Sequence, residues 1–184
     1  MSHRKIHLND MVILVDSADR QVDVAPKMYA HRAGLLHRAF SVLVFDSSGR
    51  ALLQKRAEGK YHSGGLWTNT CCSHPRPGEE TAAAAARRLG EEMGMHAGLV
   101  YRMSFIYRAD LGGGLQEHEY DHVYMAVSDD TPRPNPDEVA EYGYFAPHDV
   151  SEGLRLHPER YSAWFAIIWE RFVQGGMLRE GGAL

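Results

Sequence analysis

The chain has 184 residues, of which 44% are hydrophobic and 24% are charged, and its formal net charge at pH 7 is −4. This length suits one globular domain that buries roughly 70% of the surface of the unfolded chain. A mildly acidic chain lacks the basic face that is typical of nucleic-acid-binding proteins. No apolar run approaches the ~20 residues that cross a bilayer, so we expect neither nucleic acid nor a membrane as a partner.

The first ten residues, MSHRKIHLND, contain no apolar stretch of the kind that forms a secretory signal, and we therefore expect a cytoplasmic protein. The two cysteines, Cys71 and Cys72, are adjacent in the sequence. Neighbouring cysteines form a disulfide only with strain, so we expect two reduced thiols. We also expect a monomer.

The first predicted elements in chain order are strands. The apolar run at residues 11–16 leads into the turn sequence SADR and predicts a short strand. Residues 39–46 predict a second strand, and SSGR then turns the chain back into a hairpin partner at residues 51–56. Residues 79–93 favour a helix throughout, with Gly94 as its C-terminal cap.

Two further strands are predicted at residues 100–109 and 117–127, separated by the glycine turn LGGGL. The proline-rich stretch TPRPNPDEV predicts an extended loop, and EYGYFA predicts a strand. Residues 157–174 predict an amphipathic helix, followed by a tail at residues 175–184 that we expect to fray. No long polar linker divides these elements. The sequence therefore predicts an α/β (α+β) fold in one domain, residues 1–184, with a mixed β-sheet between helices.

The sequence EHEYDH places two glutamates at alternating positions of a predicted strand. Glu117 and Glu119 would share one face, about 7 Å apart, and would repel each other unless a positive charge lay between them. A divalent metal would supply that charge, whereas the ordinary alternative is an exposed polar face. His118 and His122 would project to the opposite face, where we expect half-buried histidines that bind no metal.

The segment TNTCCSHP combines thiols with a histidine. A thiol beside a metal or a basic group ionises readily, whereas a thiol in an apolar pocket stays protonated, and either state can serve as an acid or a base. The alternative is a pair of small buried residues in a turn. We accept that alternative for Cys71 and leave both interpretations open for Cys72.

Three histidines, His31, His37 and His74, could join the glutamates at a metal only if the fold brings them together. Imidazole combined with carboxylate oxygens suits Mg, Mn, Zn or Fe and selects none of them. Four basic residues could converge on a phosphate, although each alone is typical of a solvated surface: Lys27, Arg56, Lys60 and Arg88.

Taken together, these segments resemble the type I isopentenyl-diphosphate isomerases, a branch of the Nudix superfamily. The resemblance runs in family order from about residue 27 to residue 165, and RRLGEEMG also looks like a degenerate Nudix box. It implies a Nudix-like mixed β-sheet sandwiched by helices. The matching segments are GLLHRAFSVLVFD, LLQKR, LWTNTCCSHPRPGE, RRLGEEMG, YRAD, EHEYDH, PNPDEV and YSAWF.

The resemblance also implies roles for individual residues. The catalytic set would be Cys72, Glu119, Tyr107 and Trp164, and the diphosphate would be bound by Lys27, Arg56, Lys60 and Arg88. One divalent metal, Mn²⁺ or Mg²⁺ or else Zn²⁺, would be held by His31, His37, His74, Glu117 and Glu119. Glu92 would hold a Mg²⁺ that bridges to the substrate.

The implied reaction converts isopentenyl diphosphate to dimethylallyl diphosphate in isoprenoid precursor biosynthesis. The alkene is protonated to a tertiary carbocation, which then loses a proton from C2, so two groups are wanted on opposite sides of the substrate. We favour Glu119 with Tyr107 as the proton donor and Cys72 as the acceptor, although the sequence leaves the reverse direction open, and we expect Trp164 to stabilise the cation. No dinucleotide or flavin fingerprint is present, so we expect no flavin.

The sequence departs from the family at Ser63-Gly64-Gly65, where an aromatic-Pro-Gly step is expected, and residues 1–25 match only loosely. One alternative function is a Nudix pyrophosphohydrolase. Hydrolysis of a pyrophosphate by this superfamily usually requires a glutamate directly after the first arginine of the box, and Arg88 occupies this position. A non-catalytic module that binds a metal or a nucleotide is the other alternative, but it would have no need for Cys72, Tyr107 and Trp164.

Overall fold

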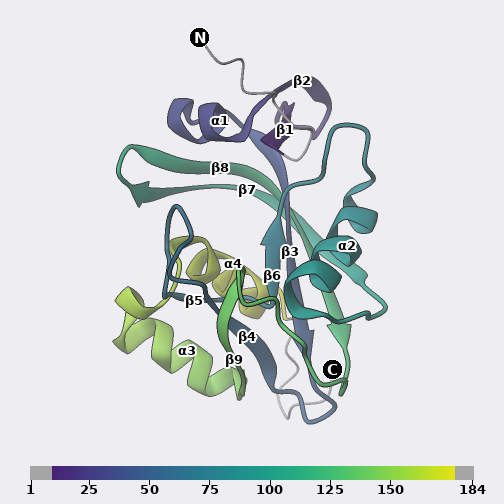
Figure 1. Cartoon of the computed structure of the whole chain (residues 1–184), viewed down its shortest axis with the longest axis vertical. Coiled ribbons are helices and arrows are strands. Elements are labelled where there is room, and N and C mark those ends of the chain that lie inside the picture. Colours follow the sequence, from purple (N-terminus) through teal and green to yellow (C-terminus); the bar gives the residue numbers. More distant parts are fainter. Residues whose placement is uncertain (1–9, 177–184) are drawn as a thin grey trace.

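The computed structural model describes residues 10–176 and builds them around one mixed β-sheet (Figure 1). All but the first two residues of the tail that was expected to fray lie outside the described residues. In chain order the elements are β1 (Met11–Val15), β2 (Gln21–Pro26), α1 (Lys27–Ala33), β3 (His37–Phe45), β4 (Ala51–Arg56), β5 (Trp67–Thr68), β6 (Cys71–Ser73), α2 (Thr81–Met93), β7 (Val100–Gly112), β8 (Leu115–Val127), β9 (Val139–Phe145), α3 (Pro147–Leu156), the 3₁₀ helix η2 (Pro158–Arg160) and α4 (Ala163–Gln174).

Strand β3 is the centre of the sheet. It pairs in the antiparallel sense with β1, β4 and β6, and in the parallel sense with β8. Every residue of β3 is buried except Arg38, which is half-buried. A strand that is covered on both faces needs apolar side chains on both, which explains the almost continuous hydrophobic run in this part of the sequence.

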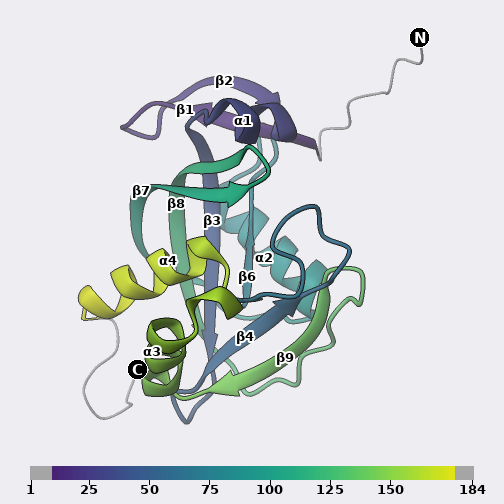
Figure 2. The same ribbon diagram turned by 90° about the vertical axis from the view of Figure 1, so that its left-hand side faces the viewer.

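Helices cover the two faces of the sheet (Figure 2). On one face, Phe40 and Val42 of β3 pack in a cluster with Leu89 of α2. On the other face, Leu43 and Phe45 belong to a second cluster that includes Phe165, Ile168 and Trp169 of α4. The expected mixed sheet between helices is therefore confirmed, and each face carries its own apolar core.

All of the predicted strands are present. The β3–β4 hairpin and β9 lie where they were expected. Strands β7 and β8 extend beyond their predicted ends, so that only Gly113 and Gly114 separate the two strands. Both glycines have positive φ, 61° and 77°, which a residue with a side chain rarely adopts. Gly94 caps α2 in the left-handed conformation, as predicted. A Cβ atom at this position would lie 2.4 Å from the Arg133 carbonyl oxygen. The proline-rich loop, which contains Arg133, therefore packs too closely for any residue but glycine at position 94.

Two predicted helix boundaries are wrong. Helix α2 begins at Thr81, because the Glu79 side chain instead accepts hydrogen bonds from the Arg76 backbone and from Arg87. The predicted helix at residues 157–174 is interrupted by an extended turn at Ser162, whose backbone N–H donates to the Trp67 carbonyl oxygen at 2.9 Å. Helices α1 and α3 and strands β2, β5 and β6 were not predicted.

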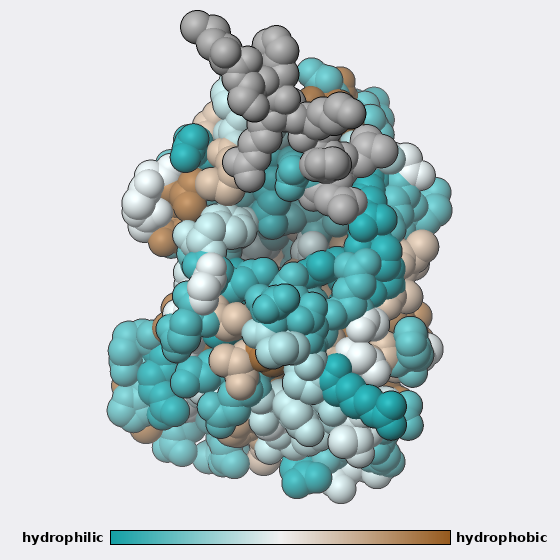
Figure 3. Space-filling model, in the orientation of Figure 1, coloured by the Kyte–Doolittle hydropathy of each residue, from teal (hydrophilic) through white to brown (hydrophobic). Residues whose placement is uncertain are grey.

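None of the helices in the described part of the chain is long and apolar enough to cross a membrane. On the face of the molecule shown in Figure 3, hydrophilic residues predominate and hydrophobic ones are scattered among them.

Candidate active site

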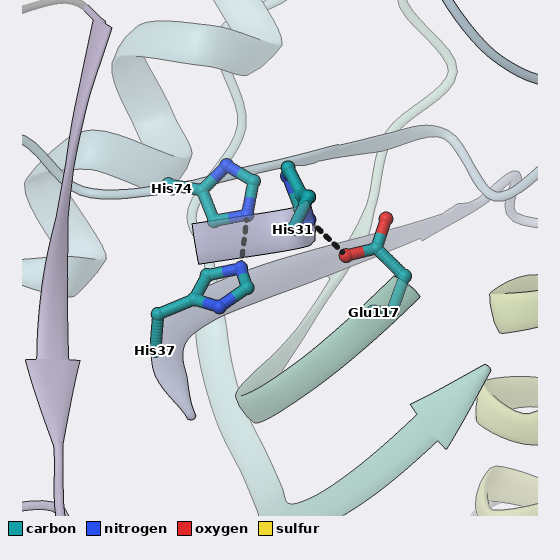
Figure 4. A group of neighbouring side chains, drawn as sticks. All are labelled: His31, His37, His74 and Glu117. Carbon is teal, nitrogen blue, oxygen red and sulfur yellow. Dashed lines mark hydrogen bonds and ion pairs between the residues drawn. The ribbon is translucent and has the colours of Figure 1, made fainter. Parts of the chain in front are cut away.

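The site forms where the beginning of β3 meets β6, β8 and α1. Because β3 and β8 are parallel and pair His37 with Glu119, their side chains point to the same side of the sheet. The residues that follow β6 bring in His74, and α1 carries His31 to the same place. Segments from three separate regions of the sequence, α1 with the adjacent β3, the residues after β6, and β8, therefore meet at one point (Figure 4).

The predicted metal ligands are clustered in the structure. Ligand atoms of His31, His37, His74 and Glu117 all lie within 4.8 Å of one another. Glu119 belongs to the same cluster, because its Oε1 lies 2.8 Å from the Nε2 atom of His74. Such a set of imidazoles and carboxylates is compatible with a divalent metal.

Three further observations fit a cation at this cluster. The Nε2 atom of His31 is buried without a hydrogen-bond partner among residues 10–176. The Nε2 atoms of His37 and His74 are 3.2 Å apart, at least one must lack a proton, and a shared cation would suit both. The Leu35 carbonyl oxygen lies 2.7 Å from the Nδ1 atom of His37, which turns the opposite nitrogen toward the cluster.

The charges of the cluster are strongly coupled. Burial lowers the pKa of His74, and the positive charge of Lys27 lowers it further, so this imidazole is neutral as a metal ligand must be. Burial opposes protonation of His37, but the Glu119 carboxylate, whose Oε1 lies 3.6 Å from Nε2 of His37, outweighs burial and raises the pKa of His37. Burial is likewise outweighed at Glu119, where the nearby His37 and the hydrogen bond from Tyr107 lower the carboxyl pKa.

The two neighbouring cysteines face different environments. Cys71 is fully buried in the core beneath α2. Cys72 points to the opposite face, where it lines the same pocket as Glu119 and Tyr107. Burial raises the pKa of the Cys72 thiol, against the charge of Arg56, so the thiol holds its proton. The structure thus gives Cys72 access to a substrate and denies it to Cys71.

The pocket also collects the predicted catalytic and diphosphate-binding residues. The Tyr107 hydroxyl donates a 2.6 Å hydrogen bond to Oε2 of Glu119. The guanidinium of Arg56 lies 5.2 Å from the ring centroid of the buried Trp164. The pocket occupies about 520 Å³ including its open mouth, and its lining includes Lys27, Arg56, Lys60, Arg88, Cys72, His74, Glu92, Tyr107, Glu117, Glu119 and Trp164.

The polar end of the pocket contains more carboxylates than the sequence predicted. Glu92 is buried, accepts a hydrogen bond from Gln54 at 2.8 Å and pairs with Arg88. Glu138 pairs with both Arg88 and Lys60. Within residues 10–176, Glu92 and Glu138 therefore form ion pairs with two of the four basic residues, Lys60 and Arg88.

Sequence reasoning missed several residues around the pocket. Asp121 is fully buried two residues beyond Glu119 on the same face of β8, and burial together with the charge of Glu119 raises its pKa. The alternation in EHEYD contained that signal. His62 and Glu138 line the pocket from loops, whose side-chain directions have no periodic signature. The expected half-buried positions of His118 and His122 agree with the structure, and these side chains approach Gly34 and Asp19 respectively.

Comparison with known proteins defines the class of the fold. The model of the NUDIX domain matches residues 35–165. A solved structure of a Deinococcus radiodurans protein superposes with a TM-score of 0.75 and 19% identity, covering 88% of this chain and 98% of that one. A MutT NUDIX hydrolase from Burkholderia pseudomallei gives 0.58 and 23% identity, with 73% and 96% covered. At these identities the two structures bear on the fold alone.

Sequence relatives narrow the family. An isopentenyl-diphosphate Delta-isomerase 2 of Aromatoleum aromaticum is 51% identical over 96% of this chain and 93% of its own length. An isopentenyl-diphosphate Delta-isomerase of Pectobacterium atrosepticum is also 51% identical, over 87% and 89%. One from Nocardia farcinica is 50% identical over 86% and 92%. The chain therefore belongs to the NUDIX family and, within it, to the isopentenyl-diphosphate Delta-isomerases.

Proposed function

We propose that this chain interconverts isopentenyl diphosphate and dimethylallyl diphosphate and thereby supplies isoprenoid precursors. The observation that carries the proposal is the pocket in which Cys72 and the Tyr107–Glu119 pair share one lining with four basic side chains. Two proton carriers serve the double-bond shift, and the basic side chains serve a diphosphate that stays intact. The names of the sequence relatives support the same activity.

In this proposal the basic residues bind the diphosphate and hold the five-carbon group against the proton carriers. Arg56 is suited to this task because its buried Nε has no hydrogen-bond partner within the described chain. The intact diphosphate provides binding energy remote from the reacting carbons, which helps to orient them. A Trp164 ring facing the carbocation would stabilise it by roughly 1–2 kcal/mol in a dry pocket.

The resting protonation states bear on which carrier donates. Burial raises the pKa of the Cys72 thiol, whereas at Glu119 the neighbouring His37, 3.6 Å away, and the hydrogen bond from Tyr107 outweigh burial and lower the carboxyl pKa. A protonated thiol can donate to the terminal alkene carbon, and an ionised carboxylate can accept the proton lost from C2. We therefore propose delivery by Cys72 and removal by Glu119, the reverse of the direction expected from the sequence.

We also propose two metal sites. His31, His37, His74, Glu117 and Glu119 would hold one divalent ion, Mn²⁺ or Mg²⁺ or else Zn²⁺, whose charge would favour the ionised form of Glu119. Glu92 would hold a Mg²⁺ that bridges to the diphosphate, since carboxylate oxygens suit this ion. Its present pairing with Arg88 would then have to rearrange. The absence of a flavin, the monomeric state and the cytoplasmic location stay predictions.

The deciding experiment incubates the purified protein with Mg²⁺ and isopentenyl diphosphate in deuterated water. We expect dimethylallyl diphosphate to form with deuterium in its carbon skeleton and without release of phosphate. Phosphate release without the isomer would instead indicate a pyrophosphohydrolase. Ligand binding with neither reaction would indicate a non-catalytic module.

A further inference from the structure

The loop between β4 and β5 contains a strained turn directly after His62. Ser63 has a φ of 51°, in the left-handed region that a residue with a side chain rarely adopts. At Gly64 a Cβ atom would lie 2.5 Å from the Glu58 carbonyl oxygen, and Gly65 again has positive φ, 73°. Strain of this kind persists where the surrounding structure holds a residue in place, and it gathers at ligand-binding sites.

The turn directs His62 into the pocket instead of toward solvent. The imidazole lines the same pocket as Cys72 and Glu119. Its ring centroid lies 5.4 Å from that of Trp164, with the two planes at 87°. This is an edge-to-face contact, the arrangement that aromatic pairs favour. The backbone oxygen of His62 also accepts a 3.4 Å hydrogen bond from Arg56, so the loop contacts both the aromatic and the cationic part of the pocket.

The imidazole is well suited to a position beside a developing carbocation. Burial lowers the pKa of His62, and the charge of Arg56 lowers it further, to about 3. The ring is therefore uncharged at neutral pH and would not repel a cation on the Trp164 ring. The mechanism proposed above uses the indole and assigns no task to the histidine that packs against it.

We propose that His62 determines the specificity of the pocket: its ring sets the tilt of the Trp164 indole and limits the width available to the branched carbon chain. This inference rests on the proposed function, because it assumes that the hydrocarbon part of the substrate lies against Trp164. It predicts that a five-carbon isoprenyl group fits and that a homologue with a bulkier branch is rejected.

The test compares isopentenyl diphosphate with its homologue in which an ethyl group replaces the C3 methyl group. The variants are His62→Ala, which removes the ring, and His62→Phe, which keeps an aromatic contact with Trp164. His148→Ala is the matched control, since its side chain is 84% exposed on α3. Turnover of each diphosphate is measured, together with its Kd by calorimetry and with bound metal.

For His62→Ala we expect kcat on the natural substrate to fall about three- to tenfold, which is the rate change that corresponds to the loss of one aromatic contact. The KM for this substrate should change little. The ratio of kcat/KM for the natural substrate to that for the ethyl homologue should fall about tenfold or more, because a close-fitting pocket discriminates against one extra methylene by about this factor. His62→Phe should keep most of the turnover and of the preference. His148→Ala should match the wild type.

Equal preferences of His62→Ala and the wild type, in turnover and in Kd, would overturn the inference. So would a loss of activity that is explained by loss of metal or by a lower unfolding temperature. Failure of the proposed function would appear separately, as a wild type that forms no isomer. The two Kd values would then still decide whether His62 limits the width of the pocket.

Discussion

The hydroxyl of Tyr107 donates a 2.6 Å hydrogen bond to Oε2 of Glu119, and the other carboxylate oxygen lies 2.8 Å from the Nε2 atom of His74. The two residues face each other because β7 and β8 pair them directly across the hairpin. The hydrogen bond from Tyr107 favours the ionised form of this carboxylate, and a cation at the histidine cluster would favour it further. Glu119 is thus prepared to accept a proton, while Cys72 in the same pocket holds one.

This difference predicts a labelling pattern in deuterated water. If Cys72 donates the proton, Glu119→Gln can still protonate isopentenyl diphosphate and return it, so deuterium should enter C4 slowly while no dimethylallyl diphosphate forms. Cys72→Ala should show neither exchange nor isomer. NMR or mass spectrometry of the recovered substrate measures the label, and elemental analysis checks that Glu119→Gln retains its metal. Exchange in Cys72→Ala but not in Glu119→Gln would restore the direction expected from the sequence.

The neighbouring cysteines should separate activity from stability. We expect Cys72→Ala to lower kcat by about 10²-fold or more, the usual contribution of a proton-transfer group, with little effect on unfolding. Cys71→Ala should keep the activity and lose about 1 kcal/mol of stability, because its buried sulfur packs beneath α2. Steady-state assays and urea unfolding of both variants measure the two effects. An inactive but fully stable Cys71→Ala protein would refute this division of roles.

The histidine cluster predicts which side chains retain metal. His74→Ala should lose at least about tenfold in affinity for the ion at this cluster, since even residues that only support a ligand contribute 10–100-fold. A chelator should lower the unfolding temperature of the wild type and have little effect on this variant. Elemental analysis and thermal scans measure these quantities, with His148→Ala as the control. Equal metal content in His74→Ala and the control would count against the cluster as a metal site.

The ion pair between Glu79, which precedes α2, and Arg87 in the middle of α2 predicts a pH dependence of stability. The hydrogen bond from Arg87 lowers the pKa of Glu79 below its ordinary value of 4.5. A lowered native pKa stabilises the fold above the unfolded pKa, and this stabilisation is lost as the pH falls from about 4.5 through the native value. Glu79→Gln should therefore cost about 1 kcal/mol at pH 7, at the upper end for a partly exposed pair, and progressively less below pH 4.5.

Urea unfolding at several pH values between 7 and 3 measures that difference. Glu159→Gln is the control, because the Glu159 side chain is 70% exposed. A deficit of Glu79→Gln that stays constant down to pH 3 would show that the carboxylate charge does not stabilise the native state.

The sequence alone predicted much of the local structure. Alternation in EHEYDH placed Glu117 and Glu119 on one face of a strand, and Gly94 marked the end of α2. These predictions succeeded because strand and helix periodicity, like the conformational freedom of glycine, are properties of a short stretch of chain. The helix at residues 157–174 was predicted less well, because a contact of Ser162 with the distant Trp67 divides it.

The tertiary structure decided how the candidate residues meet. Only the parallel pairing of β3 with β8 places His37 beside Glu119, and only the unpredicted helix α1 brings His31 and Lys27 to them. His62 enters the pocket through a strained turn that has no periodic pattern. The sequence determined which face each side chain takes, since that depends on local geometry. Which faces meet depends on pairing between distant strands, whose free energy is gained only when the whole sheet and its two cores assemble.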